Sequence, residues 1–236
     1  MKASSNSRLL EPMARQLGPL LDEVVFVGGQ VTGLLFTDPA AARTRVTVDV
    51  DVICSAVTRV QYERVAERLR ALGFREDSSA GAPICRWRSE AGILDVMPLG
   101  ERALGFANRW YPLAFETSRT HTLPSGMRIR IPRAEVFLAT KWSAVEGRAG
   151  GDYIGSHDLE DIVSLFAGRP ELPDEVAAAE PELRGWIAEQ TRNFLASSDA
   201  AYAIAGALPD ARFDPALPMR VESRLRRVAE ASDVGE

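Results

Sequence analysis

The sequence predicts an α+β or mixed α/β fold, in which a small mixed sheet is followed by a helical C-terminal domain. Two observations predict it. Up to residue 132, short β-branched segments alternate with glycine turns, whereas after Pro132 apolar residues recur at helical spacing in four long segments. We therefore expect a sheet domain over residues 1–132 and a helical domain over residues 133–236, with an active-site cleft between them.

Each predicted element follows from a local pattern. Apolar runs and period-two alternation predict strands, recurrence every three to four residues predicts helices, and glycine or proline marks the ends. The expected strands cover residues 23–27, 45–53, 83–88, 93–97 and 127–131. The expected helices cover residues 31–36, 59–72, 135–146, 157–166, 181–195 and 220–231.

Composition limits the classes of protein that this chain fits. The 236 residues carry a net charge of −5, and Cys54 and Cys85 have neither disulfide nor zinc-site spacing, so we expect a reducing, cytoplasmic compartment. The N-terminal residues lack the apolar core of a signal peptide, and no apolar run is long enough to cross a bilayer. The sequence thus predicts neither a secreted nor a membrane protein.

The acidic balance does not predict general affinity for nucleic acid, which needs a basic surface. Local arginine groups are candidate patches, although a solvated charged face is the commoner explanation of such groups. The groups are Arg64, Arg68 and Arg70; Arg128, Arg130 and Arg133; and Arg220, Arg224, Arg226 and Arg227.

Acidic residues concentrate in one predicted strand. In RVTVDVDVI, Thr47, Asp49 and Asp51 project from the same side because side chains alternate along a strand. Two close carboxylates repel each other unless a cation lies between them, and Mg²⁺ prefers such oxygen ligands. Asp95, inside the apolar run ILDVM, is costly to bury without a partner and is the candidate third carboxylate, as metal ligand and general base. An acid-x-acid pair alone is not specific, since exposed strands and glycosyltransferases also carry it.

A glycine pair precedes this strand. Gly28 and Gly29 lie where a predicted strand turns into a helix, so their backbone N–H groups could approach a phosphate. A plain turn explains the pair equally well. A second signal is Lys141, which with Lys2 makes up all the lysine of the chain; a lysine ammonium is a compact charge suited to triphosphate oxygens.

These segments resemble a known superfamily. VFVGGQVTGLL followed by RVTVDVDVI is similar to the first motif of the polymerase-beta-type nucleotidyltransferases, in which a glycine pair precedes an acid-x-acid strand. PRAEVFLATKWSAVEGR and then SHDLEDIVSLF resemble the AbiEii/AbiGii-type nucleotidyltransferase toxins, which include the MenT group. The resemblance covers residues 24–166. It departs from the pattern in the long gap between Gly29 and Asp49, and in His157, where lysine is common.

The resemblance implies a set of site residues. Lys141 would contact the nucleotide phosphates and Arg148 would support it, while Asp158 and Asp161 would flank the site from one face of the next helix. Asp158 also fits a first helical turn capped by Ser156, so Asp161 is the stronger candidate. We expect Asp49, Asp51 and Asp95 to bind Mg²⁺, or Mn²⁺ in its place, and Gly28, Gly29 and Thr47 to contact the nucleotide.

The expected activity is transfer of a nucleoside monophosphate from a nucleoside triphosphate (NTP) to an acceptor hydroxyl. The resemblance implies the 3′ end of tRNA as acceptor, and a toxin with a cognate antitoxin as partner. Two alternatives stay open from the sequence. One is transfer to a small molecule, as in antibiotic-modifying nucleotidyltransferases, which suits the acidic charge. The other is a nucleotide-binding regulatory module without catalysis.

Overall fold

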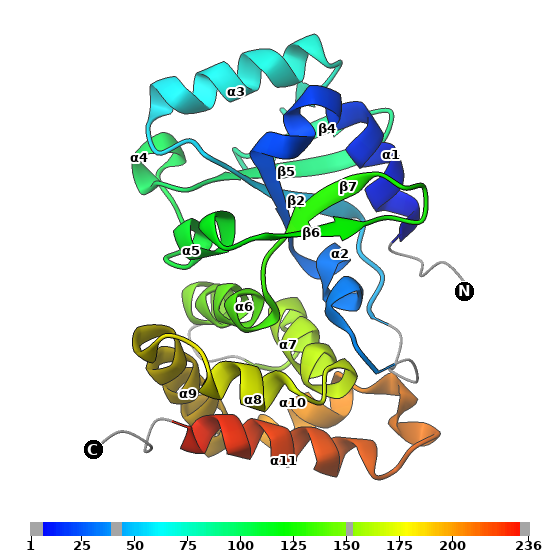
Figure 1. The fold of residues 1–236 in the computed structure, drawn as a ribbon, viewed down its shortest axis with the longest axis vertical. Coiled ribbons are helices and arrows are strands. Elements are labelled where there is room, and N and C mark those ends of the chain that lie inside the picture. The colour runs from blue at the N-terminus through cyan, green and yellow to red at the C-terminus, as the bar shows by residue number, and fades with distance from the viewer. Residues whose placement is uncertain (1–6, 39–43, 150–152, 232–236) are drawn as a thin grey trace. The chain divides into compact units, whose positions relative to one another are not determined.

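The structure is a computed structural model that describes residues 7–38, 44–149 and 153–231 (Figure 1). It confirms the α+β class, with a five-stranded mixed sheet, a two-stranded sheet and many helices. The chain forms two compact units: Met1–Val31 with Val46–Arg133, and Thr32–Arg45 with Ala134–Glu236. One junction lies at Arg133, and two others enclose residues 32–45, a segment that the sequence placed in the first domain.

The larger sheet belongs to the first unit. Its strands, in spatial order, are β1 (Val24–Val27), β2 (Asp49–Cys54), β5 (Gly92–Pro98), β4 (Arg86–Ser89) and β3 (Arg75–Glu76). Strands β2 and β5 are parallel, and the other pairs are antiparallel. The alternation over residues 45–53 predicted a longer strand, but β2 begins at Asp49. Pairing with β1 reaches back only to Asp51 and pairing with β5 only to Asp49, so residues 45–48 pair with no strand of the described residues.

One face of this sheet is apolar and covered. Val52 and Val96 are fully buried there, and Trp87 follows on the same face of β4. Helix α3 (Arg59–Ala71) packs on this face, where the hydroxyl of its Tyr62 donates to the Val96 carbonyl at 3.1 Å. Helix α1 (Ser7–Leu17), which the sequence patterns did not predict, contacts β2 and β5. The opposite face carries the acidic residues.

Shorter elements complete the first unit. They are the 3₁₀ turn Gly18–Glu23, α2 (Gly29–Thr32, which crosses into the second unit), α4 (Glu101–Leu104), α5 (Tyr111–Glu116), β6 (Arg119–Thr122) and β7 (Arg128–Ile131). Strands β6 and β7 form an antiparallel hairpin, and β7 lies beside β1.

The second unit is helical (Figure 1). Its helices are α6 (Ala134–Ala149), α7 (His157–Gly168), α8 (Leu172–Ala177), α9 (Pro181–Ala196), α10 (Ala200–Gly206) and α11 (Leu217–Glu230). Helix α7 is central: its Ile162 and Phe166 are fully buried, and both α6 and α11 pack against it.

The segment that precedes Asp38 docks on the end of α7. A 3₁₀ turn, Gly33–Leu35, contacts α7, and the backbone N–H groups of Thr37 and Asp38 both donate to the Gly168 carbonyl at 3.0 Å. The Phe36 ring lies so close to Gly168 that a Cβ there would be 2.5 Å from ring carbons. Residues 32–38 are therefore an integral part of the helical unit.

No helix within the described ranges is long and apolar enough to cross a membrane.

Candidate active site

Three predicted carboxylates lie on one face of the first unit's sheet. The parallel register of β2 and β5 places Asp51 beside Asp95, and Asp49 lies two residues before Asp51 on the same face. The antiparallel register of β4 and β5 then places Arg86 beside Asp95. Asp51, Asp95 and Arg86 thus form a row across three adjacent strands.

Arg86 pairs with two of these carboxylates. Its Nε and Nη2 atoms donate to the two oxygens of Asp95 at 2.8 and 2.7 Å, and Nη2 also donates to Asp49 Oδ2 at 3.0 Å. The Asp95 side chain is only 9% exposed, so this pairing offsets much of the cost of burying its charge. Hydrogen bonding to Asp95, despite some desolvation, raises the pKa of Arg86 above its usual value.

Gly28 allows the glycine turn to approach Asp51 closely. Its φ is +74°, in the left-handed region that favours glycine. A Cβ on Gly28 would overlap the Asp51 carboxylate, lying 2.7 Å from Cγ. The structure therefore gives Gly28 a definite role beside the acid-x-acid strand. Gly29 begins the short helix α2.

Gln30 ties the glycine turn to the start of β2. Its buried Nε2 donates to the Thr47 hydroxyl and, at 3.1 Å, to the Asp49 carbonyl. Thr47, which we predicted as a nucleotide contact, is itself only 6% exposed. The hydrogen bonds of Gln30 thus connect residues 47–49, where β2 begins, to the glycine turn.

The residues present suit a divalent cation in chemistry. Mg²⁺ prefers carboxylate oxygens and commonly uses one or two carboxylates together with substrate phosphates, and adjacent strands supply three here. Across the described ranges, no three His, Cys, Asp or Glu side chains are grouped as a metal site. Between Asp49 and Asp95, the guanidinium of Arg86 supplies the positive charge.

The second unit holds a separate cluster of charges around Lys141. From α6, Lys141 Nζ reaches Asp158 Oδ1 at 3.0 Å and Asp161 Oδ2 at 2.7 Å on α7. The Lys141 side chain is 7% exposed and that of Asp161 1%. The Ser156 hydroxyl accepts from the Leu159 N–H and caps α7, as predicted. Both predicted aspartates thus contact the predicted lysine.

Arg45 joins this cluster, although the sequence did not single it out. Its Nε and Nη2 each donate to one oxygen of Asp161 at 3.2 Å. Burial lowers the pKa of Arg45, but attraction and hydrogen bonding to Asp161, together with attraction to Glu160 and Asp158, leave the pKa raised. Of the remaining predicted residues, Arg148 belongs to α6, but its side chain lies outside the described residues. His157 is exposed and lies 3.1 Å from Glu160.

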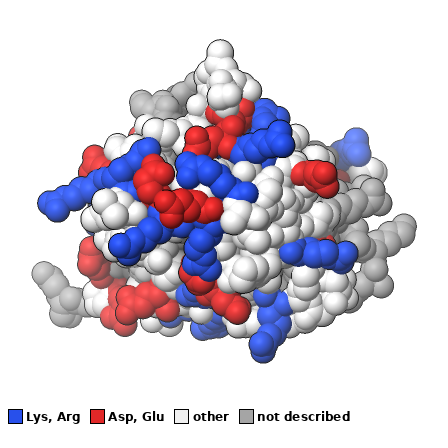
Figure 2. Space-filling view, turned by 90° about the horizontal axis from the view of Figure 1, so that it is seen from above, with Lys and Arg blue, Asp and Glu red and all other residues white. Residues whose placement is uncertain are grey.

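The candidate basic patches are largely paired with acids or with backbone carbonyls. Arg68 pairs with Glu23 and Arg70 with Glu76, and Figure 2 shows positive and negative side chains interleaved on the face that it views. In the second unit, Arg224 donates to the Phe166 carbonyl at 2.6 Å. These contacts agree with solvated or structural roles for the groups that contain these arginines.

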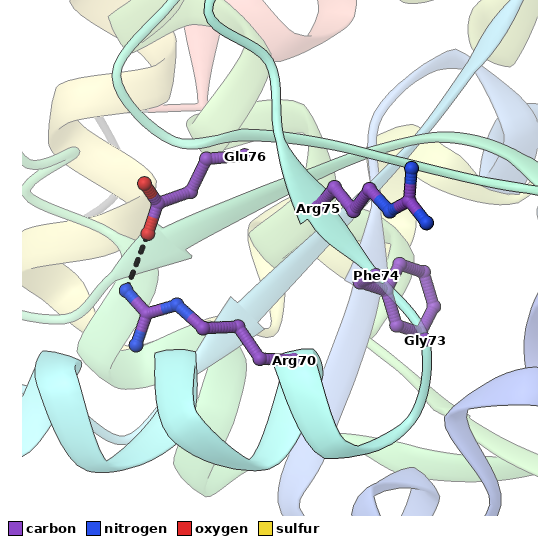
Figure 3. Close-up of a pocket in the computed structure, with 5 residues that line it drawn as sticks. All are labelled: Arg70, Gly73, Phe74, Arg75 and Glu76. Atoms are coloured by element: carbon purple, nitrogen blue, oxygen red, sulfur yellow. Dashed lines mark hydrogen bonds and ion pairs between the residues drawn. The ribbon is translucent and has the colours of Figure 1, made fainter.

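A surface hollow of the first unit shares no lining residue with either charge cluster. It measures about 450 Å³ and is lined by Arg70, Gly73, Phe74, Arg75 and Glu76 (Figure 3). Of its three charged residues, Arg70 and Glu76 pair with each other and Arg75 is exposed, while Phe74 is buried.

One missed residue was recoverable from the sequence. The predicted strands over 83–88 and 93–97 are joined by a short turn, and a hairpin that pairs Ser89 with Gly92 necessarily pairs Arg86 with Asp95. Arg45 gave no such signal, since its partner is 116 residues away along the chain.

Comparison with protein-family models finds no match to this chain, and comparison with curated proteins finds none either.

Proposed function

We propose that this protein is a magnesium-dependent nucleotidyltransferase. The observation that carries the proposal is the row of carboxylates on adjacent strands, Asp51 beside Asp95 with Asp49 on the same face, next to a glycine turn that approaches Asp51 closely. A cation at such a group would neutralise charge on a triphosphate during phosphoryl transfer. The resemblance of residues 24–166 to nucleotidyltransferases agrees with this assignment.

In the proposed reaction, an acceptor hydroxyl attacks the α-phosphorus of an NTP. The new oxygen–phosphorus bond forms as the bond to the β-phosphate oxygen breaks, and pyrophosphate leaves. Asp49 and Asp51 would hold the cation with the triphosphate, while Asp95 would complete this site and accept the hydroxyl proton. Catalysis then depends mainly on positioning and charge.

Lys141 is proposed to bind triphosphate oxygens. Its two carboxylate partners, Asp158 and Asp161, fix the ammonium group, and Arg45 also pairs with Asp161. A positioned ammonium loses less freedom on binding a ligand than a mobile one. This part of the proposal rests on the resemblance and on the buried pairing within the second unit.

For the acceptor, we propose the 3′ end of tRNA, with a toxin role neutralised by a cognate antitoxin, on the strength of the resemblance. The second candidate is a small-molecule hydroxyl. The net charge of −5 and the pairing of surface arginines with acids favour that candidate, because tRNA binding needs cationic side chains available to phosphates.

The test is transfer of label from each α-³²P-labelled NTP, with Mg²⁺ and total tRNA. Asp49→Ala with Asp51→Ala should lower transfer at least about a thousandfold, equivalent to ~4 kcal/mol of transition-state stabilisation. Glu67→Ala, which removes an exposed acid from α3 in the same unit, is the control and should transfer label at the wild-type rate.

The outcomes separate the candidates. Label in tRNA that requires the aspartates, with a rate that falls steeply with salt, supports the tRNA acceptor. Label found only in added small hydroxyl compounds supports the second candidate. Magnesium-dependent NTP binding without pyrophosphate release would refute nucleotidyl transfer. It would support the alternative of a nucleotide-binding regulatory module without catalysis.

A further inference from the structure

Arg86 occupies the position between two proposed metal ligands. Its Nη2 atom alone lies 2.7 Å from Asp95 Oδ2 and 3.0 Å from Asp49 Oδ2, so one nitrogen bridges one oxygen from each strand. A cation that used these two oxygens together would need the space that this nitrogen fills. The guanidinium and a divalent cation therefore cannot bind this pair of oxygens at the same time.

The side chain of Arg86 can leave without movement of the sheet. Its backbone is fixed by pairing of β4 with β5 opposite Asp95, but its side chain is 22% exposed and has several rotatable bonds. A rotamer change toward solvent would release both carboxylates. The released guanidinium stays charged, because an arginine side chain is not deprotonated in proteins.

We propose that Arg86 is a built-in counter-ion that competes with the divalent cation for Asp49 and Asp95, so that metal binding releases its guanidinium to bind triphosphate oxygens. This inference rests on the proposed function and adds a triphosphate-binding residue to it. Without metal, Arg86 holds Asp95 and limits repulsion among the carboxylates. With metal and triphosphate, the two ion pairs exchange partners: metal with carboxylates, guanidinium with phosphate.

The exchange has a measurable consequence for metal affinity. If Arg86 occupies the carboxylates in most molecules, the apparent affinity for metal is the intrinsic affinity multiplied by the fraction of molecules in which the carboxylates are open. Removing the guanidinium should therefore tighten metal binding in the absence of nucleotide, whereas triphosphate binding should weaken once the guanidinium is gone. An arginine with a purely structural role would not move these two affinities in opposite directions.

The experiment is titration of the full-length protein with Mn²⁺ at pH 8, without nucleotide, by calorimetry and by electron paramagnetic resonance. Arg86→Met should bind Mn²⁺ roughly tenfold more tightly than wild type, as expected if about nine molecules in ten have Arg86 bound. Arg88→Met is the matched control. Arg88 lies on the same strand and face but pairs with Asp77, so its loss tests the general effect of removing one positive charge.

Equal or weaker Mn²⁺ binding by Arg86→Met, or the same gain in Arg88→Met, would overturn the inference. A different result bears on the proposed function: if Asp49→Asn with Asp51→Asn leaves Mn²⁺ binding unchanged, the cation does not bind at the carboxylates at all.

A second measurement avoids any effect of the variant on folding. In ¹⁵N-labelled wild-type protein, the Arg86 Nε–H, which donates to Asp95, should exchange slowly with solvent and should exchange faster once Mg²⁺ saturates the protein. The signal is assigned by its loss in Arg86→Lys. Exchange that stays unchanged at saturating Mg²⁺ would contradict the competition.

Discussion

At the scale of single residues, Gly28 shows how a backbone position can serve a charged side chain. Its φ of +74° disfavours residues with a side chain, and a Cβ at this position would overlap the Asp51 carboxylate. Two separate reasons therefore favour glycine there. The first reason is common to many turns. The second applies only where a side chain needs the space that a Cβ would fill.

Gly28→Ala should therefore do more damage than other substitutions at a left-handed glycine. Gly126→Ala, with a φ of +86° and no atom within 4 Å of a Cβ, should cost only about 1–2 kcal/mol of stability from backbone strain. Gly28→Ala should add about 1–3 kcal/mol from displacing Asp51 and should lower label transfer about a hundredfold. Urea denaturation and the transfer assay check this; equal effects of the two variants would refute the role of Gly28.

Lys141 illustrates the opposite case, a buried charge that depends on its partners. Lys141→Met would leave Asp158 and Asp161 buried beside each other with one cation fewer, so we expect a loss of about 3–5 kcal/mol. A double-mutant cycle with Asp158→Asn should give a coupling energy of at least about 1 kcal/mol by urea denaturation. Additive losses would show that the two side chains do not stabilise the second unit through this ion pair.

At the scale of elements, the end of α7 fixes the position of residues 32–38. Gly168 combines close contact with the Phe36 ring and acceptance of two backbone hydrogen bonds through its carbonyl. Gly168 is the last residue of α7, and the position needs glycine because a Cβ there would overlap the ring.

Two helix glycines provide a matched test of this packing. Gly168→Ala should destabilise the protein by about 1–3 kcal/mol, because its Cβ would overlap the Phe36 ring. Gly185→Ala in α9, where no atom lies within 4 Å of a Cβ, should instead stabilise it by about 0.5–1 kcal/mol through helix propensity. Thermal unfolding of both variants would show whether their effects have opposite signs; a stabilising Gly168→Ala would contradict the packing.

Local pattern was sufficient for several long helices and insufficient for the start of β2. The helices α3, α7 and α9 follow from apolar spacing and end signals, which are properties of the segment itself. The start of β2 did not follow, because alternation defines the two faces of a strand but not where a neighbouring strand ends. Helix α1 was recoverable from local pattern, because Leu10, Met13, Ala14 and Leu17 recur at helical spacing and all are buried.

The same distinction applies to the candidate site. The shared face of Asp49 and Asp51 follows from strand alternation, and the pairing of Arg86 with Asp95 follows from the hairpin. The parallel register that puts Asp51 beside Asp95 does not, since it joins strands about forty residues apart through long-range packing. The contact of Arg45 with Asp161 is beyond local pattern for the same reason.

At the scale of the whole molecule, neither unit is continuous in the sequence. The second unit takes residues 32–45 from the first half of the chain, and these supply Arg45 to Asp161 and Phe36 to Gly168. The helical half is therefore incomplete without them.

Residues 134–236 alone should lack a cooperative thermal transition, because they lose a buried ion-pair partner, worth about 3–5 kcal/mol, and an aromatic contact. Residues 32–45 joined to 134–236 through a Gly/Ser linker of about 20 residues, with an r.m.s. span of about 25 Å, should restore the transition. Circular dichroism during heating measures both. Equal cooperativity of the two fragments would mean that the inserted segment is dispensable for folding.

The interleaving of the two units also limits how such a gene can change. A single recombination event after Arg133 would exchange Ala134–Glu236 but leave behind the piece at 32–45 that completes them. Gly28 lies four residues before that piece and Asp49 four residues after it, so an exchange of the piece must rejoin the chain close to the proposed site. We therefore expect the two units to be inherited together, and differences within residues 32–45 among descendants of this gene to be matched by changes in α7.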